Sequence, residues 1–112
     1  MSRISSHVLD ISKGRPAEGM TVILKEHGNS DTTKEISRGK TNPDGRIIDL
    51  ACELRLNQGS YEMIFEVESY FAKEGKECFY PRVSILFKVS EGENYHIPLL
   101  LSPFGYSTYR GS

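Results

Sequence analysis

The stretch YEMIFEV, residues 61–67, alternates large apolar residues with glutamates along most of its length. Every second position is apolar, namely Tyr61, Met63, Phe65 and Val67. Successive side chains of a β-strand point to opposite faces, so a period of two places these residues on one face. The stretch therefore predicts a strand with one face in a hydrophobic core.

Other segments of the chain follow the same rule. Residues 20–26 form a β-rich run, and residues 83–89 repeat the alternation with Val83, Ile85, Phe87 and Val89. Only residues 68–77 resemble a helix, of a turn or two that ends at Gly75 or just after it. The pattern predicts an all-β fold, a two-sheet β-sandwich with one short helix. At 112 residues we expect a single domain, residues 1–112, around one core.

The segment TNPDGR, residues 41–46, is a turn signal. Pro43 presets its own backbone angle, and Gly45 tolerates a positive φ. The turn would hold Arg46 at the start of the next short strand, residues 46–50. A turn arginine is usually solvated, so Arg46 alone is weak support for a site.

Two predicted strands carry apolar residues on both faces. In residues 4–11 one face has Ser6 and Val8, and the other has His7, Leu9 and Ile11. In residues 95–101 one face has four large apolar residues, and the other has His96, Pro98 and Leu100. A second apolar face needs its own cover, most simply another subunit, and both histidines would lie on that covered surface.

Pro98 constrains the second of these strands further. Proline has no backbone N–H and cannot donate a ladder hydrogen bond. We therefore expect Pro98 where its strand has no partner on that side, or at a bulge.

Composition excludes several classes of protein. Fourteen Lys and Arg against fifteen Asp and Glu leave a net charge of −1, which argues against nucleic acid as a partner. The chain shows no secretory signal, no membrane-spanning run and no peroxisomal tripeptide, so we expect a cytoplasmic protein. Cys52 and Cys78 are expected to be reduced, partly buried thiols, without zinc.

Three histidines are present, and two of them are candidates for chemistry. His27 lies in a polar stretch and is expected to be a surface turn residue, whereas His7 and His96 lie on apolar strands. A lone strand histidine is more often structural. Two of them together with Arg46 favour function, since neutral imidazole accepts a proton from water and arginine holds an anionic or polarised substrate.

The final stretch YSTYRGS, residues 106–112, is unusual for a chain end. Tyr109 could be aromatic packing, Arg110 a salt-bridge partner and Gly111 slack. Ser112 would carry the ionised α-carboxylate, which can orient an imidazole as an aspartate would. The chain has no GxSxG elbow, no set of three or four metal ligands and no phosphate loop. The remaining functions are hydrolysis or hydration of a small polar molecule, or simple ligand binding.

Several of these motifs together resemble the 5-hydroxyisourate hydrolases, the transthyretin-related enzymes of urate breakdown. The matching segments are SHVLD with GRPA, TNPDGR, YHIPLLLSP and the closing YSTYRGS. Transthyretin, the hormone carrier of the same fold, lacks that ending and the paired histidines. The resemblance implies a transthyretin-like sandwich of two four-stranded sheets with a short helix. It also implies a homotetramer, a dimer of dimers, with active sites in the channel between dimers.

The resemblance also implies a site and a reaction. The catalytic residues would be His7, Arg46, His96 and Ser112. The substrate would be bound by His7, Arg46 and Tyr109. Arg110 and Gly111 would shape the tail. Water would open 5-hydroxyisourate to 2-oxo-4-hydroxy-4-carboxy-5-ureidoimidazoline without a metal, a cofactor or a covalent intermediate. Spacing does not reveal which histidine is the base. The rival interpretations are a non-catalytic carrier of a small aromatic ligand and a structural β-sandwich.

Overall fold

The computed structural model describes residues 3–28, 32–48, 50 and 56–111. Its longer strands are β1 (Ile4–Asp10), β3 (Thr21–His27), β4 (Thr33–Lys40), β6 (Gly59–Phe65), β7 (Val83–Val89), β8 (Tyr95–Ser102) and β9 (Gly105–Thr108). Two short strands, β2 (Arg15–Pro16) and β5 (Arg46–Ile47), and one helix, α1 (Val67–Ala72), complete the described elements. The fold is all-β with one short helix, as predicted.

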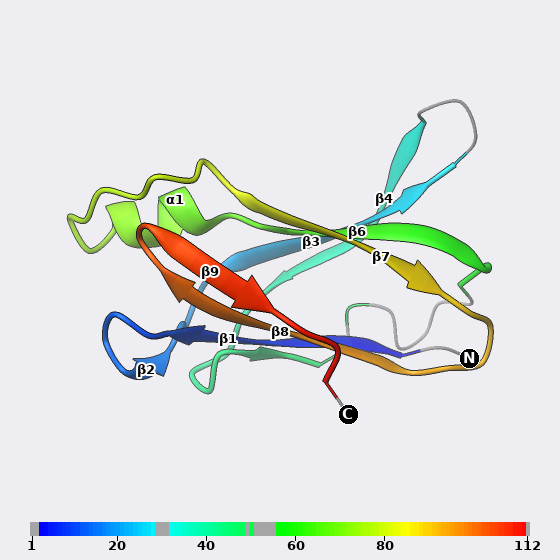
Figure 1. The fold of residues 1–112 in the computed structure, drawn as a ribbon, viewed down its shortest axis with the longest axis horizontal. Coiled ribbons are helices and arrows are strands. Elements are labelled where there is room, and N and C mark those ends of the chain that lie inside the picture. The colour runs from blue at the N-terminus through cyan, green and yellow to red at the C-terminus, as the bar shows by residue number, and fades with distance from the viewer. Residues whose placement is uncertain (1–2, 29–31, 49, 51–55, 112) are drawn as a thin grey trace.

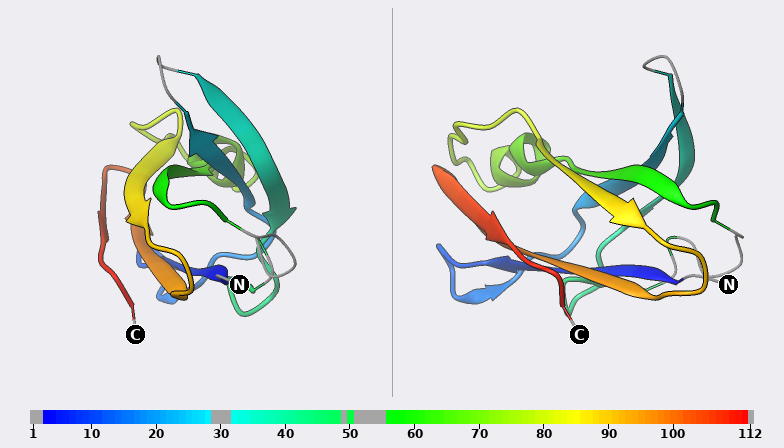
Figure 2. Two further views of the ribbon diagram at one scale, coloured as in Figure 1. Left: turned by 90° about the vertical axis from the view of Figure 1, so that its right-hand side faces the viewer. Right: turned by 45° about the vertical axis from the view of Figure 1, so that its right-hand side comes forward.

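The strands form two layers that face each other (Figures 1 and 2). Sheet A has the order β2-β1-β8-β9, with β5 also paired to β1, and sheet B has the order β4-β3-β6-β7. The expected four strands in each sheet become five in sheet A, because the two-residue β2 shares one edge of β1 with β5. The helix α1 follows β6 and contributes Val67, Tyr70 and Phe71 to the buried interior.

The core lies between the sheets. Residues 61–67 contribute to it the apolar side chains that their alternation predicts. Tyr61, Met63 and Phe65 of β6 are buried, as is Val67 at the start of α1. Alternate residues of β1 and β8 meet them from the other sheet, namely Ile4, Val8, Ile97, Leu99 and Leu101. Burial of these apolar side chains is the main stabilising contribution to such a sandwich.

The two-faced character of β1 and β8 is confirmed. Along β1 burial alternates strictly, with Ser5, His7 and Leu9 half-buried on the outward face. Along β8 the outward face carries His96, Pro98 and Leu100, of which Pro98 is buried. We name the outward face of sheet A the histidine face.

Pro98 lies where the missing N–H does no harm, as expected. The β8–β9 ladder ends at the pair Leu99–Thr108, one residue short of Pro98. The Thr108 hydroxyl donates to the Pro98 carbonyl at 2.7 Å, so this side of Pro98 faces the β9 edge after the ladder has stopped.

Several boundaries differ from the sequence predictions. The helix is shorter than residues 68–77, since it ends at Ala72 and a turn runs on to Gly75, whose φ is 69°. Among the described residues of the predicted strand 46–50, Arg46 and Ile47 alone form a strand, β5. The strands β2, β4 and β9 were not predicted. His27 is not in a turn: it ends β3, half-buried, with Nε2 2.8 Å from Glu62 Oε1.

Two further expectations concern cysteines and membranes. Cys78 is a free, half-buried thiol, whereas Cys52 lies outside the described residues. Within the described part of the chain, no helix is long and apolar enough to cross a membrane.

The turn of residues 41–46 is docked on β1 by backbone contact. The Val8 N–H donates to the Gly45 carbonyl at 2.8 Å, and Asn42 Oδ1 accepts the N–H groups of Asp44 and Arg46. Gly45 has φ of 75°, and a Cβ there would lie 2.4 Å from the Val8 carbonyl oxygen. Only glycine permits this approach, which places β5 beside β1.

Gly45→Ala should therefore destabilise the protein more than Gly14→Ala. Both glycines have positive φ, but a Cβ on Gly14 would meet nothing within 4 Å. Alanine at Gly14 should lose about 1–2 kcal/mol of unfolding free energy from backbone strain. Alanine at Gly45 should lose about 1–3 kcal/mol more, from overpacking against β1. Urea unfolding of the two variants measures the difference, and equal losses would contradict the docking.

Candidate active site

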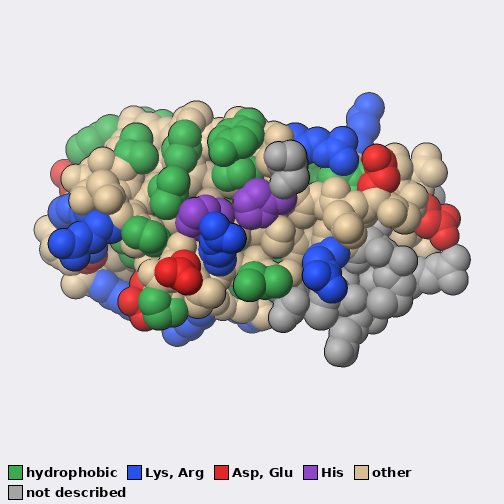
Figure 3. Space-filling model, turned by 90° about the horizontal axis from the view of Figure 1, so that it is seen from below, with side chains coloured by type: hydrophobic (Ala, Val, Ile, Leu, Met, Phe, Trp, Pro, Cys, Tyr) green, Lys and Arg blue, Asp and Glu red, His purple; other side chains and the backbone are tan. Residues whose placement is uncertain are grey.

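Three of the predicted site residues come together on the histidine face. Arg46 of β5 pairs with His7 of β1, and β1 pairs in parallel with β8, so that Ser5 is opposite His96 and His7 opposite Pro98. His7 and His96 are therefore diagonal neighbours on one face of the sheet. Figure 3 shows this face, where two histidine side chains lie side by side at the centre with a basic side chain against them.

The ring of His96 is oriented by a residue of β1. Its Nδ1 is hydrogen-bonded to Ser5 Oγ at 2.9 Å, across 91 positions of sequence. Burial, with smaller contributions from the nearby charges of His7 and Arg46, lowers the pKa of His96 below its ordinary value of 6.5. His96 is therefore neutral at pH 7, the state in which imidazole can accept a proton.

A half-open hollow of about 510 Å³ lies beside His96 and Arg46. Its lining includes Arg3, Ser5, Arg46, Asn94, His96 and Gly111. The described residues that line it include two arginines and no carboxylate, so the hollow favours an anionic or strongly polarised guest. Its volume is in the range of small-molecule sites.

The tail after β9 returns to His96. The register of β8 and β9, with Leu99 opposite Thr108, carries on to an isolated bridge between His96 and Gly111. The Gly111 N–H donates to the His96 carbonyl at 2.7 Å. A Cβ on Gly111 would lie 2.6 Å from His96 Cδ2, so the ring packs directly on the glycine.

The other predicted tail residues have different positions. Tyr109 is 59% exposed and does not line the hollow beside His96. Arg110 lies over the ring of Tyr95, with Cζ 4.7 Å from the ring centroid. Ser112 lies outside the described residues.

Sequence reasoning missed Ser5, Arg3 and Asn94. Ser5 could have been found, because it is two positions before His7 and shares its face. Arg3 and Asn94 have no such signal. They meet only because β1 and β8 pair, with the Arg3 N–H donating to Asn94 Oδ1 at 2.9 Å.

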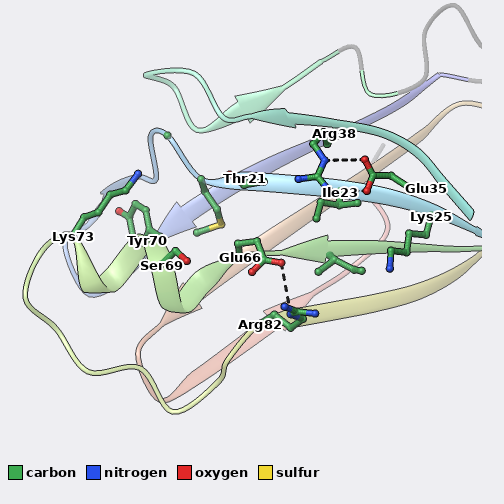
Figure 4. A pocket seen from close by; sticks show the side chains of 13 residues that line it. Thr21, Ile23, Lys25, Glu35, Arg38, Glu66, Ser69, Tyr70, Lys73 and Arg82 are labelled. Carbon is green, nitrogen blue, oxygen red and sulfur yellow. Dashed lines mark hydrogen bonds and ion pairs between the residues drawn. The ribbon is translucent and has the colours of Figure 1, made fainter. Parts of the chain in front are cut away.

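A second hollow, of about 440 Å³, lies on the outer face of sheet B beside α1 (Figure 4). Two of the four basic side chains that line it, Arg38 and Arg82, are paired with Glu35 and Glu66. None of the predicted site residues that the structure describes lines this second hollow. The predicted site residues that the structure describes thus lie on sheet A and its tail.

Comparison with known proteins decides the family. The model of the HIUase/Transthyretin family matches residues 4–111. The chain belongs to the HIUase/Transthyretin family. A probable 5-hydroxyisourate hydrolase of Caenorhabditis elegans is 42% identical over 97% of this chain and 81% of its own length. The 5-hydroxyisourate hydrolase of Salmonella typhimurium is 41% identical over 97% and 80%.

Solved structures of the family agree with the fold. The 5-hydroxyisourate hydrolase of Klebsiella pneumoniae has a TM-score of 0.88 at 39% identity, covering 100% of this chain and 94% of its own. Sea bream transthyretin in complex with thyroxine has a TM-score of 0.91 at 28% identity, covering 96% and 93%. The predicted transthyretin-like sandwich is confirmed, and the hydrolase relatives, which match over nearly the whole chain, indicate that this chain is a hydrolase.

The lowered pKa of His96 can be measured by NMR titration of its ring protons. We expect a midpoint below 6.5, because burial, the neighbouring His7 and the charge of Arg46 all disfavour the imidazolium of His96. Arg46→Gln removes the charge of Arg46 and should move the midpoint upward. Arg82→Gln, on the other sheet, is the matched control and should leave it unchanged. A midpoint at or above 6.5 in the unmodified protein would contradict the assignment.

Gly111→Ala should disturb His96 without unfolding the chain. The new methyl group would overlap the imidazole at Cδ2, and the ring or the tail must move. Gly105→Ala is the control, since a Cβ there meets only Ser102 Oγ, at 3.8 Å. We expect a shifted His96 ring signal for Gly111→Ala and an unchanged signal for Gly105→Ala. Unchanged His96 signals would contradict the packing.

Proposed function

We propose that this protein hydrolyses 5-hydroxyisourate to 2-oxo-4-hydroxy-4-carboxy-5-ureidoimidazoline. The observation behind the proposal is the arrangement of His7, Arg46 and His96 on one sheet face, with the tail held against His96. The hydrolase names of relatives at 41–42% identity support the substrate. The single domain and a cytoplasmic location remain predictions.

The proposed mechanism is attack of water on the C6 carbonyl of the substrate. A neutral histidine takes a proton from the water as its oxygen forms the new bond to C6. The tetrahedral intermediate carries an oxyanion, which the Arg46 guanidinium stabilises. The C6–N1 bond then breaks as N1 takes the proton back from the histidinium, and the six-membered ring opens to a carboxylic acid.

His96 is better suited than His7 to be the base. Its pKa is lowered, so it is deprotonated at neutral pH, and Ser5 fixes its orientation through Nδ1. If Nδ1 donates its proton to Ser5 Oγ, Nε2 has a free lone pair for water. His7 would then contact substrate beside Arg46, its partner across the β1–β5 pair.

Tyr109 and Ser112 keep their predicted roles in this proposal. Tyr109 is exposed on the tail and would contact the substrate. The carboxylate of Ser112 would orient a histidine, a role supported by the position of the preceding Gly111 against His96.

We also propose the homotetramer, with sites between dimers. The histidine face keeps Leu9 and Leu100 half-buried, while Ile48 and Tyr109 are more than half exposed. A soluble protein gains from covering such a face, and a second pair of subunits would enclose the hollow.

A carrier of a small aromatic ligand is the rival function, because sea bream transthyretin shares the fold in complex with thyroxine. A carrier gains little from placing two histidines and an arginine in its binding site, because each polar group loses hydration there. Turnover distinguishes the two functions directly.

The deciding assay generates 5-hydroxyisourate in place with urate oxidase and follows the decay of its ultraviolet absorbance. Added protein should accelerate the decay, and circular dichroism should reveal a single enantiomer of the product. His7→Ala and His96→Ala should each lower kcat/KM by about 10²–10⁴, the usual contribution of a general acid or base.

His27→Ala is the matched control for these variants. His27 lies on sheet B, paired with Glu62, and its loss should leave turnover unchanged. Decay no faster than in buffer would eliminate the hydrolase, and full turnover by His96→Ala would eliminate His96 as the base.

A further inference from the structure

Arg110 belongs to the same tail as Tyr109 and Gly111, yet its side chain serves a different purpose. We propose that Arg110 is a positioning residue: it anchors the tail to Glu93 and Tyr95 on the side of sheet A opposite the histidine face, and does not touch substrate. An effect of Arg110 on turnover rests on the proposed function. The anchor, meaning the contacts of Arg110 with Glu93 and Tyr95, does not.

Strand alternation places Arg110 and Gly111 on opposite sides of sheet A. The register pairs Leu99 with Thr108, and it returns to His96 with Gly111. Counting between these pairs places Arg110 opposite Ile97, whose side chain is buried in the core. Since paired residues share a face, Arg110 lies on the inner side of sheet A, and Gly111 shares the outer side with His96.

The inner side of sheet A is open at this edge, and Arg110 covers it. A cavity of about 320 Å³ lies here between the two sheets, lined by Phe87, Tyr95, Ile97, Tyr109 and Arg110 among others. The guanidinium lies over the ring of buried Tyr95, and Nη2 is 3.8 Å from Glu93 Oε1. Arg110 does not line the hollow beside His96.

The anchor points of Arg110 are themselves fixed. The Tyr95 hydroxyl donates to Glu93 Oε2 at 3.2 Å and accepts the Ser90 N–H at 2.7 Å. The Tyr95 ring packs against Phe87, with centroids 6.3 Å apart. Arg110 therefore binds the packed ring of Tyr95, at the start of β8, and the Glu93 carboxylate just before β8, which accepts a hydrogen bond from the Tyr95 hydroxyl.

The anchor matters because the ladder beside it is incomplete. Pro98, opposite Tyr109, has no N–H to donate. Beyond the ladder, the described part of the tail, residues 109–111, is therefore joined to β8 by backbone only at Gly111. A cation–π contact and an exposed ion pair are each weak, but together they stabilise the backbone pairing of Gly111 with His96. Losing them should release Gly111 from His96 and misplace the ring.

Hydrogen exchange of the Gly111 amide, followed by NMR on the full chain, tests the anchor without any substrate. In Arg110→Gln we expect exchange at Gly111 to rise about tenfold, while the amides of the β8–β9 ladder keep their protection. Arg110→Lys keeps a cation and Tyr95→Phe keeps a ring face, so both variants should retain most of the protection of the Gly111 amide. Glu93→Gln should give an intermediate increase.

Arg82→Gln is the matched control, since Arg82 is as exposed as Arg110, at 60% and 61%, and pairs with Glu66 on sheet B. It should change neither exchange at Gly111 nor turnover. For Arg110→Gln we expect kcat to fall several-fold with little change in KM, and partial recovery in Arg110→Lys.

Unchanged Gly111 exchange in Arg110→Gln would overturn the anchor, and a raised KM with unchanged exchange would instead assign Arg110 to substrate. If the unmodified protein fails to turn over 5-hydroxyisourate but Arg110→Gln still frees Gly111, the anchor stands and the proposed function falls.

Discussion

The parallel pairing of β1 with β8 is the contact on which the candidate site depends. It sets Ser5 opposite His96 and His7 opposite Pro98, joining residues about 90 positions apart in the chain. Slippage of either strand by one residue would turn its own histidine toward the core, His7 in β1 or His96 in β8. The buried side chains on the inner faces thus hold the register that aligns the polar side chains on the outer face.

Two glycines bring further segments to this pair of strands. Gly45 allows the turn before β5 to contact the backbone of β1, which places Arg46 opposite His7. Gly111 allows the tail to pack on the ring of His96. At both positions a side chain would overlap the neighbouring strand, so the absence of a Cβ is what lets these segments lie against β1 and β8.

Much of the fold could be predicted, and the exceptions have physical reasons. Strands with one face in the core, such as β6 and β7, show a clear period of two. The edge strand β4 was missed because Thr33–Lys40 is polar and largely exposed, with Ile36 as its one large apolar residue. His27 was misplaced for a related reason: its polar neighbours suggested a turn, but β3 continues through it, and its side chain contacts that of Glu62.

The sequence by itself determined the sandwich, the two-faced strands and the candidate residues His7, Arg46 and His96, because alternation and turn chemistry are local properties of the chain. Only the tertiary structure decided which of these residues meet, added Ser5, Arg3 and Asn94 to them, and turned Arg110 away from them. These outcomes depend on the pairing of distant strands. That register follows from the packing of the whole core, which no single segment encodes.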